Sequence, residues 1–305
     1  MVDYGKIWFN GKLRDQSECM VSVASHALHY GTSVFEGIRA YKTPKGTAIF
    51  RLTDHLKRMY FSSAVYRMPV PYELEVLDQA CRDTVQANEL ESAYIRPMVS
   101  RGNCGLGVMP RDMSMVDVSI IVSPWGAYLG EEGLKNGIKA CVTSWQRLAP
   151  NTMPPGAKAG GNYLSSLLIG LEARERGFEE GIGLGRDGLL SEGAGENIFI
   201  IEKGRLITPP VSASILAGIT RNTVITLARQ RGMEVAEQTI AREQMYAADE
   251  IFMTGTAAEV TPVRQLDHIT IGNGGCGPIT RQVQDDFFGL FNGRTEDRWG
   301  WLEYV

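Results

Sequence analysis

Short apolar runs, each bounded by turn residues, open the chain. The runs Lys6 to Phe9, Gly37 to Lys42 and Thr47 to Arg51 predict strands, since short apolar stretches between turn signals are typical of them. Asp54 is then a good helix start, and the apolar positions after it recur at helical spacing up to a break near Pro69. The chain therefore begins with strands followed by a helix.

A second helix is predicted at about Leu74 to Asn88, followed by two strand-like runs, Ala93 to Ser100 and Val116 to Ser123. This first part has an α+β pattern. The segment from Pro124 to Gly137 carries a proline, several glycines and two glutamates without an apolar period. We expect this segment to connect two domains, and function tends to lie at such a connection.

The second half alternates strands and helices, which is typical of an α/β domain. Its most distinctive helix, expected from Tyr163 to Arg176, has an apolar stripe on one face formed by Leu164, Leu167, Leu168 and Leu171. We therefore expect an α/β chain with a small α+β domain at 1–124, a connecting loop at 125–136 and a larger domain at 137–305. The other elements expected in the second half are a strand at Ile138 to Ser144, a strand after Gly181, a hairpin of Asn197 to Ile201 with Arg205 to Thr208, a helix beginning near Ile219, a strand at Glu250 to Thr254 and a helix after Pro278.

Composition narrows the class of partner. The 305 residues carry a formal net charge of −4, which gives no basic field for nucleic acid or a membrane surface, so a small-molecule partner is expected. The 34 glycines exceed the usual share of roughly 7% and suggest loops that approach a ligand. Five scattered cysteines without a C-x-x-C pair fit reduced thiols better than disulfides or a zinc site. With no signal-peptide pattern, we expect a cytoplasmic protein and no metal.

Lys158 is the first candidate for chemistry. It precedes the helix expected from Tyr163, is flanked by alanines, and is followed by two glycines that leave room for a bulky group. A desolvated lysine has a lowered pKa and can form an imine with an aldehyde. The residues alone leave open the alternative of a solvated loop lysine.

Glu192 is the second candidate, because a carboxylate among small residues could pair with a pyridinium nitrogen. Two other places suit a phosphate: the helix start at Ile219 and Thr220, which carries no acid, and the turn after Gly255 with the hydroxyl of Thr256. Arg58 could add a charge-assisted contact. Solvated glutamates, ordinary helix caps and a solvated arginine are the alternatives.

The spacing G-x-G-x-x-G occurs twice, at Gly183 to Gly188 and at Gly272 to Gly277. A lone match is weak evidence for dinucleotide binding. The first is followed by a turn and a strand where a helix is required, and too few residues follow the second for a dinucleotide-binding sheet. We predict that neither binds a dinucleotide.

Taken together, the motifs resemble the fold-type IV PLP (pyridoxal 5'-phosphate) enzymes, and specifically the branched-chain amino acid aminotransferases. The similarity covers nearly the whole chain in the family's order. The motifs are SHALHYGTSVFEGIRAY (25–41), YIRP (94–97), PWGAYLG (124–130), AKAGGNY (157–163), SEGAGEN (191–197), GITRNT (218–223) and GTAAEVTP (255–262).

The resemblance implies two domains with PLP between them and assigns roles by position. Lys158 resembles the lysine that forms the Schiff base and moves the substrate proton, and Glu192 resembles the partner of the pyridine nitrogen. The remaining cofactor residues implied are Tyr163 at the ring oxygen, Leu216 against the ring, and Arg58, Ile219, Thr220 and Thr256 around the phosphate.

The resemblance also implies a substrate pocket for branched-chain amino acids, glutamate and their 2-oxo acids. Arg96 would bind the γ-carboxylate of glutamate, which cannot be buried unpaired beside an apolar pocket. The loop from Gly105 to Met109 reaches a neighbouring subunit in relatives, so a homodimer is the smallest unit implied, and a hexamer of dimers is also allowed. The other substrate residues implied are Tyr94, Thr256 and Ala257 at the α-carboxylate and Phe35, Tyr30, Val108, Trp125 and Tyr128 around the side chain.

Departures from the family pattern are small. Ala217 replaces a common proline, and the redox C-x-x-C of animal relatives is absent. The alternatives within the fold are a D-amino acid aminotransferase, an aminodeoxychorismate lyase and an R-selective amine transaminase; YIRP and GTAAEVTP argue against the first two. Outside it, a nicotinamide oxidoreductase and a non-catalytic binding protein remain as alternatives.

Overall fold

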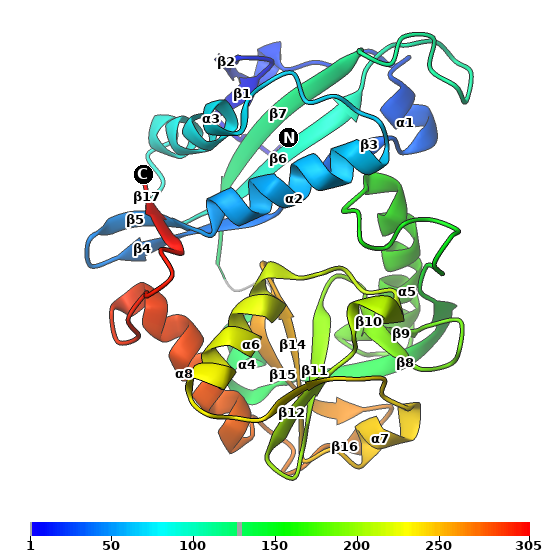
Figure 1. Ribbon diagram of the computed structural model, residues 1–305, viewed down its shortest axis with the longest axis vertical. Helices are drawn as coiled ribbons and strands as arrows, with labels where there is room; N and C mark the ends of the chain where they lie inside the picture. Colours follow the sequence, from blue (N-terminus) through cyan, green and yellow to red (C-terminus); the bar gives the residue numbers. More distant parts are fainter. Residues whose placement is uncertain (1, 127–129) are drawn as a thin grey trace. The chain divides into compact units, whose positions relative to one another are not determined.

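The computed structural model describes residues 2–126 and 130–305. The chain divides into two compact units, each built on its own sheet (Figure 1). The first unit comprises Met1–Trp125, Ala157–Gly161 and Asp297–Val305, and the second comprises Gly126–Gly156 and Asn162–Glu296. Within the described ranges, no helix has the length and apolar character needed to cross a membrane.

The sheet of the first unit has eight strands, and all its neighbouring strands are antiparallel. Its order is β17-β5-β4-β6-β7-β1-β2, with β3 paired to β6. The strands are β1 (Lys6–Phe9), β2 (Lys12–Asp15), β3 (Ser33–Phe35), β4 (Ile38–Thr43), β5 (Gly46–Phe50), β6 (Ala93–Arg101), β7 (Val116–Pro124) and β17 (Leu302–Tyr304).

Two helices, α2 (Leu52–Val65) and α3 (Leu74–Ala87), lie side by side against this sheet (Figure 1). Leu56 of α2 and the β6 residues Ile95 and Val99 are fully buried in the shared core. Because side chains alternate along a strand, the β6 residues between these apolar ones lie on the opposite face. Two short helices complete the unit, η1 (Gln16–Glu18) and α1 (His26–Tyr30).

The sheet of the second unit has nine strands in the order β10-β9-β8-β15-β14-β11-β12-β13, with β16 paired to β15. Three pairs are parallel, β8 with β9, β8 with β15 and β12 with β13. The strands are β8 (Ile138–Gln146), β9 (Glu180–Leu184), β10 (Leu190–Gly193), β11 (Asn197–Glu202), β12 (Arg205–Thr208), β13 (Val235–Glu237), β14 (Glu250–Gly255), β15 (Glu259–Leu266) and β16 (Ile269–Thr270).

Both faces of this second sheet are covered. Ile198 and Ile200 of β11 join one core, whereas Phe199 stacks on Phe252 of β14 with ring centroids 4.9 Å apart. Burial on both faces explains why the central strands are almost continuously apolar. The helices of the unit are α4 (Gly130–Asn136), α5 (Tyr163–Glu175), α6 (Ile219–Gln230), α7 (Arg242–Tyr246) and α8 (Pro278–Asn292), with the short η3 (Val211–Ala213). The short η2 (Gly160–Asn162) lies where the chain passes from the first unit to the second.

The glycine-rich segment expected to be a loop contains helix α4. Glutamates in its first turn stabilise the helix, because their negative charge lies near the positive end of the helix dipole. At its other end, Arg281 donates to the carbonyl of Lys135, and Gln284 donates to that of Leu134, each at 2.8 Å. These bonds from α8 satisfy terminal carbonyls that a short helix leaves open, so tertiary contacts stabilise a helix that the segment's own pattern does not predict.

The apolar stripe predicted on α5 forms, but it does not face the core of the second unit. The buried residues of α5 are Ile169 and Ala173, and Ala173 packs with Cys141 of β8. The stripe residues are instead 39–68% exposed: Leu164, Leu167, Leu168 and Leu171.

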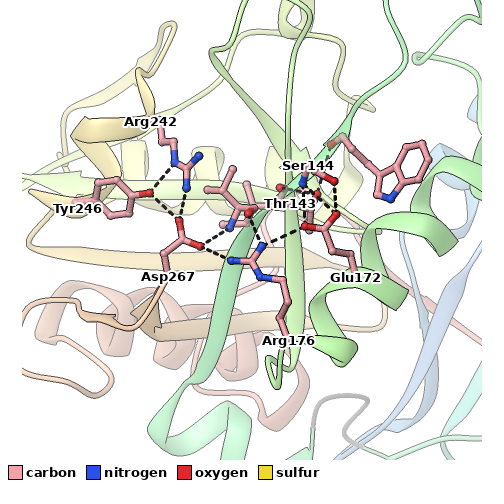
Figure 2. Close-up of polar contacts among 10 residues, drawn as sticks. Thr143, Ser144, Glu172, Arg176, Arg242, Tyr246 and Asp267 are labelled. Atoms are coloured by element: carbon pink, nitrogen blue, oxygen red, sulfur yellow. Dashed lines mark hydrogen bonds and ion pairs between the residues drawn. The ribbon is translucent and has the colours of Figure 1, made fainter.

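A polar network fixes the other end of α5, opposite Tyr163. Figure 2 shows Arg176 lying between Asp267 and Glu172. Asp267 Oδ2 accepts bonds from Arg242 Nη2 and from the Tyr246 hydroxyl, both at 2.7 Å. Its Oδ1 accepts the amide of Val142 at 3.0 Å, and Ser144 donates to Glu172. The network therefore ties α5 to β8, α7 and the turn after β15.

Replacing Asp267 by Asn tests this network. Asn tolerates the left-handed backbone at this position, where φ is 47°, so the change removes charge without backbone strain. We expect the free energy of unfolding to fall by about 1–2 kcal/mol, since charge-assisted bonds from two arginines weaken. Urea denaturation at fixed protein concentration measures this.

The matched control is Glu234→Ala, which breaks an exposed ion pair with Arg205. Its effect should stay below about 0.5 kcal/mol. Equal losses for the two variants would contradict a structural role for the Asp267 network.

Candidate active site

Tyr94 and Arg96 lie on the face of β6 that points away from the core. Phe35 pairs in register with Met98 of the same strand, so it shares that face. Arg96 Nη2 donates to the Tyr94 hydroxyl at 2.7 Å, and the guanidinium carbon lies 4.5 Å from the Phe35 ring centroid and 5.0 Å from that of Tyr94. A cation is thus held against two aromatic rings.

The rings of Phe35 and Tyr94 form an aromatic wall, which Trp125 extends. Its ring stacks on Tyr94 with centroids 4.6 Å apart and planes at 28°. The Tyr94 hydroxyl also approaches the backbone closely, because a Cβ on Gly37 would lie only 2.2 Å from it. A glycine is therefore required beside Glu36 for this tyrosine to lie where it does.

Tyr30 and Val108 are the most exposed of the expected substrate residues, at 43% and 71%. The Tyr30 hydroxyl donates to the carbonyl of Leu106 at 2.8 Å, and His26 Nε2 lies 3.1 Å from that of Val108. The tyrosine hydroxyl therefore helps to hold the loop that carries Leu106, and its role at the substrate side chain stays a prediction. Tyr128, expected at the same pocket, lies outside the described residues.

Lys158 is positioned by the first unit, to which the loop Ala157–Gly161 belongs. Ala159 forms an antiparallel bridge with Val34, and the amide of Phe35 donates to the carbonyl of Lys158 at 3.1 Å. Lys158 Nζ lies 5.1 Å from the Phe35 ring centroid. The lysine and Arg96 therefore contact the same aromatic ring.

Arg58 lies beside this wall through Glu36, the neighbour of Phe35 in the chain. Arg58 Nε and Nη2 donate to the two oxygens of Glu36, each at 2.7 Å, in a bidentate pair. His55 Nδ1 lies 2.7 Å from Glu36 Oε2. Glu36 is completely buried, and the Arg58 side chain is 12% exposed.

These three side chains set each other's charge. Burial alone would raise the pKa of Glu36, but Arg58 and His55 outweigh it and hold that pKa below its usual value. Burial lowers the pKa of His55, and Glu36 only partly opposes the shift. At neutral pH the cluster is therefore a carboxylate, a guanidinium and an uncharged imidazole.

Glu192 is the corresponding buried carboxylate of the second unit, with 4% of its surface exposed. Arg147 Nη2 donates to its Oε1 at 2.5 Å, while Asn197 Nδ2 at 3.0 Å and the amide of Leu216 at 3.1 Å donate to its Oε2. Asn197 also donates to the Leu216 carbonyl at 2.9 Å. Both carboxylate oxygens are thus fixed in direction.

The residues of the second unit that are expected to bind the phosphate lie at two places, the start of a helix and a turn between two strands. Ile219 and Thr220 open helix α6 after Gly218, and the first turn of this helix carries no acidic side chain. Thr256 and Ala257 lie in the turn between β14 and β15, which Thr261 braces by donating to the Ala258 carbonyl. Helix amides and a hydroxyl are suitable donors for an anion.

Tyr163 is the first residue of α5. It lines a cavity of about 420 Å³ in the second unit, together with Ser166 and Glu196. Ser166 also accepts a bond from Arg147 Nη1 at 3.2 Å. The start of α5 is therefore linked through Arg147 to Glu192.

The two G-x-G-x-x-G matches have packing explanations. A Cβ on Gly183 would lie 2.7 Å from Arg147 Cγ, so this glycine makes room for the arginine that reaches Glu192. At the second match, a Cβ on Gly277 would lie 2.1 Å from the Glu250 carboxyl carbon. Glu250 itself accepts the amides of Ile279 and Thr280, so a side chain of the protein already binds the start of α8.

Comparison with known proteins gives the family. Residues 33–266 match the family model described as amino-transferase class IV. The chain belongs to the class IV aminotransferases. A branched-chain-amino-acid aminotransferase of Escherichia coli (strain K12) is 55% identical over 299 residues, which are 98% of this chain and 97% of that protein. The family predicted from the motifs is confirmed.

Solved structures agree. A crystal structure of the Escherichia coli branched-chain amino acid aminotransferase has a TM-score of 0.97 and 55% identity, covering 98% of each chain. The T.th. enzyme with pyridoxamine 5'-phosphate has a TM-score of 0.96 and 45% identity, covering 100% of this chain and 99% of that one. Its complexes with N-(5'-phosphopyridoxyl)-L-glutamate and with 4-methylvaleric acid each have a TM-score of 0.94 and 42% identity, with the same coverage. The expected α/β fold is confirmed.

Four of the residues that organise these groups were not singled out from the sequence: Glu36, His55, Arg147 and Asn197. Glu36 and Asn197 lie inside the motifs quoted for the resemblance, so a search for partners of Arg58 and Glu192 could have found them. Arg147 lies in no quoted motif, and only the tertiary structure brings it to Glu192.

Replacing Gly218 by Ala tests the anchoring of Glu192. The new Cβ would lie 1.9 Å from Asn197 Oδ1, so Asn197 must move and give up its bonds to Glu192 and Leu216. We expect the free energy of unfolding to fall by about 1–3 kcal/mol. Gly275→Ala is the control, because its Cβ meets only Asn273 Oδ1 at 3.8 Å. If thermal or urea unfolding shows the two variants to be equally stable, Asn197 does not anchor Glu192 as described.

Proposed function

We propose that this protein is a PLP-dependent branched-chain-amino-acid aminotransferase. It transfers the amino group of L-leucine, L-isoleucine or L-valine reversibly to 2-oxoglutarate, giving a branched 2-oxo acid and L-glutamate. The reaction serves either the last step of branched-chain amino acid biosynthesis or the first step of degradation. The observation that carries the proposal is Arg96, a cation set against the rings of Phe35 and Tyr94, with Lys158 Nζ against the same Phe35 ring.

The donor set fits PLP part by part. The cofactor has an aldehyde, a basic ring nitrogen, a ring oxygen and a phosphate, and the two units contain a lysine, a buried carboxylate, a tyrosine and several anion donors. Glu192 matches the nitrogen because both its oxygens are already oriented. The residues that would hold PLP are Lys158 through a covalent link, Glu192, Tyr163, Leu216 against the ring, and Arg58, Ile219, Thr220 and Thr256 at the phosphate.

When bound, PLP supplies a carbonyl that takes up the amino group of one substrate and a protonated ring that accepts electrons from its Cα. Lys158 Nζ removes the proton from that Cα and returns one to the other substrate in the reverse direction. Glu192 keeps a proton on the ring nitrogen by placing a buried negative charge beside it. Two half-reactions with ping-pong kinetics follow.

The aromatic wall accounts for two kinds of substrate. We expect an uncharged branched side chain to pack on Phe35 and Trp125, and the γ-carboxylate of glutamate to pair with Arg96. Tyr30, Val108 and Tyr128 are the further pocket residues that the family resemblance implies. Tyr94 and the amides at Thr256 and Ala257 hold the α-carboxylate. Support comes from the T.th. enzyme, which was solved both with a phosphopyridoxyl-glutamate and with 4-methylvaleric acid.

We infer that the protein works as a homodimer at least, and a hexamer built from dimers is consistent with the same surfaces. The loop that Tyr30 and His26 hold carries Leu106, Val108 and Met109, which are 68–78% exposed. The leucine stripe of α5 is a second exposed apolar surface. A second copy of the chain would cover such surfaces.

A cytoplasmic location is also proposed. All five cysteines are free thiols; Cys81 is buried in the core of the first unit, and Cys141 is buried beside Ala173 and Phe178. Reduced thiols of this kind suit a reducing compartment.

A substrate panel with 2-oxoglutarate as acceptor tests the function. L-leucine, L-isoleucine and L-valine should be turned over, and faster turnover of D-alanine than of L-leucine would refute the assignment. Good turnover of amines without a carboxylate would indicate an amine transaminase instead. A colourless protein that reduces a nicotinamide, or one without any activity, would favour the oxidoreductase or the binding protein.

Replacing Lys158 by Ala should abolish turnover and leave PLP binding measurable, because the other donors of the cofactor remain. Absorbance titration with PLP and a coupled glutamate assay measure the two properties. Retained turnover would show that Lys158 is not the catalytic base.

Replacing Arg96 by Leu should lower kcat/KM for glutamate by about 10–100-fold, since a charge-assisted pair is lost and a carboxylate is left unpaired. For leucine the change should be less than about threefold. Each substrate serves as the control for the other, and equal losses for both would refute the pairing of Arg96 with the γ-carboxylate.

A further inference from the structure

Glu36 is a fully buried carboxylate, and the side chains that bond it, Arg58 and His55, are not residues assigned to substrate. Its two oxygens accept bonds from Arg58 and one of them also meets His55, all at 2.7 Å. Burying a carboxylate is costly even with partners, and apolar residues often replace buried ion pairs without loss of stability. A role besides stability therefore has to be considered for Glu36.

Helix α2 presents the partners of Glu36 on one face. His55, Arg58 and Ser62 follow each other at spacings of three and four residues, which places them along one side of the helix. Glu36 occupies the edge of the guanidinium formed by Nε and Nη2. Because a guanidinium is planar, this contact fixes its plane and directs the Nη1 end away from Glu36.

The same helix face holds Lys158. Ser62 Oγ accepts a bond from the amide of Lys158 at 3.0 Å and donates to the carbonyl of Arg58 at 2.9 Å. Ser62 is completely buried. Within the first unit, Ser62 thus joins the backbone of Lys158 to the turn of α2 that carries Arg58.

We propose that Glu36 is a positioning residue that orients Arg58 toward the phosphate of PLP before the cofactor binds. The proposal rests on the function proposed above. Glu36 holds one edge of the guanidinium through two bonds, so the orientation of this group is set before the phosphate arrives. Ser62 keeps Lys158 on the same rigid segment, so the covalent link and the phosphate contact are placed together.

Two effects of Glu36 oppose each other. Its negative charge repels a phosphate, whereas its contacts remove the rotamer freedom that Arg58 would otherwise lose on binding. Orientation should dominate, because the charge of Glu36 is compensated by the bidentate pair with Arg58. Removing Glu36 should therefore weaken the binding of the phosphate, and a gain in affinity would contradict the proposal.

The test compares PLP with pyridoxal, which lacks the phosphate, in titrations of the full-length apoprotein followed by absorbance and fluorescence. Glu36→Gln should lower the affinity for PLP by about tenfold or more, as expected for loss of a charge-assisted contact. The affinity for pyridoxal should change by less than about twofold. Glu303→Gln is the matched control, because Glu303 bonds Thr53 in the first turn of α2 and not Arg58, so it should leave both affinities unchanged.

Two further variants separate orientation from other effects. Glu36→Asp keeps the charge but is too short for the bidentate contact, so it should also lose PLP affinity selectively, and it replaces Glu36→Gln if that variant does not fold. In an Arg58→Gln background, substitution of Glu36 should have no additional effect on PLP affinity. An additional loss there, or unchanged phosphate preference in both Glu36 variants, would overturn the proposal. Failure of the unaltered protein to bind PLP would instead refute the proposed function.

Discussion

The candidate site depends on one constraint, that a carboxylate taken out of water must keep charged or hydrogen-bonding partners. Glu36 and Glu192 are both buried, and each is held through both oxygens, by Arg58 and His55 in one case and by Arg147, Asn197 and the amide of Leu216 in the other. Satisfying these bonds fixes the side chains around each carboxylate. In each unit, the fixed arrangement of these side chains is therefore a consequence of charge burial.

Within each unit, the periodicity of the sheet positions the remaining groups. Alternation along β6 turns Ile95 into the core and Tyr94 and Arg96 to the opposite face, and the pairing of β3 with β6 adds Phe35. In the second unit, β11 begins at Asn197, the residue that bonds Glu192. Regular elements set the positions, and the loops between them supply amides and hydroxyls.

Most helices and strands of this chain could be predicted from local pattern, as with α3 and the hairpin of β11 and β12, because apolar spacing and turn residues agree there. Helix α4 could not, because α8 supplies the partners of its last carbonyls. The outward direction of the α5 stripe and the approach of Arg147 to Glu192 also depend on tertiary packing. Lys158 and Glu192 were singled out in their motifs, and Glu36 lies inside another quoted motif, whereas Arg147 lies in none and only tertiary packing brings it to Glu192.

The central claim is that Lys158 carries PLP. Reduction of the purified yellow protein with borohydride, followed by proteolysis and mass spectrometry, tests it most directly. The account predicts loss of the yellow colour and one modified peptide, with the pyridoxyl group on Lys158. Modification of another lysine, or a protein that contains no such group after incubation with PLP, would contradict it.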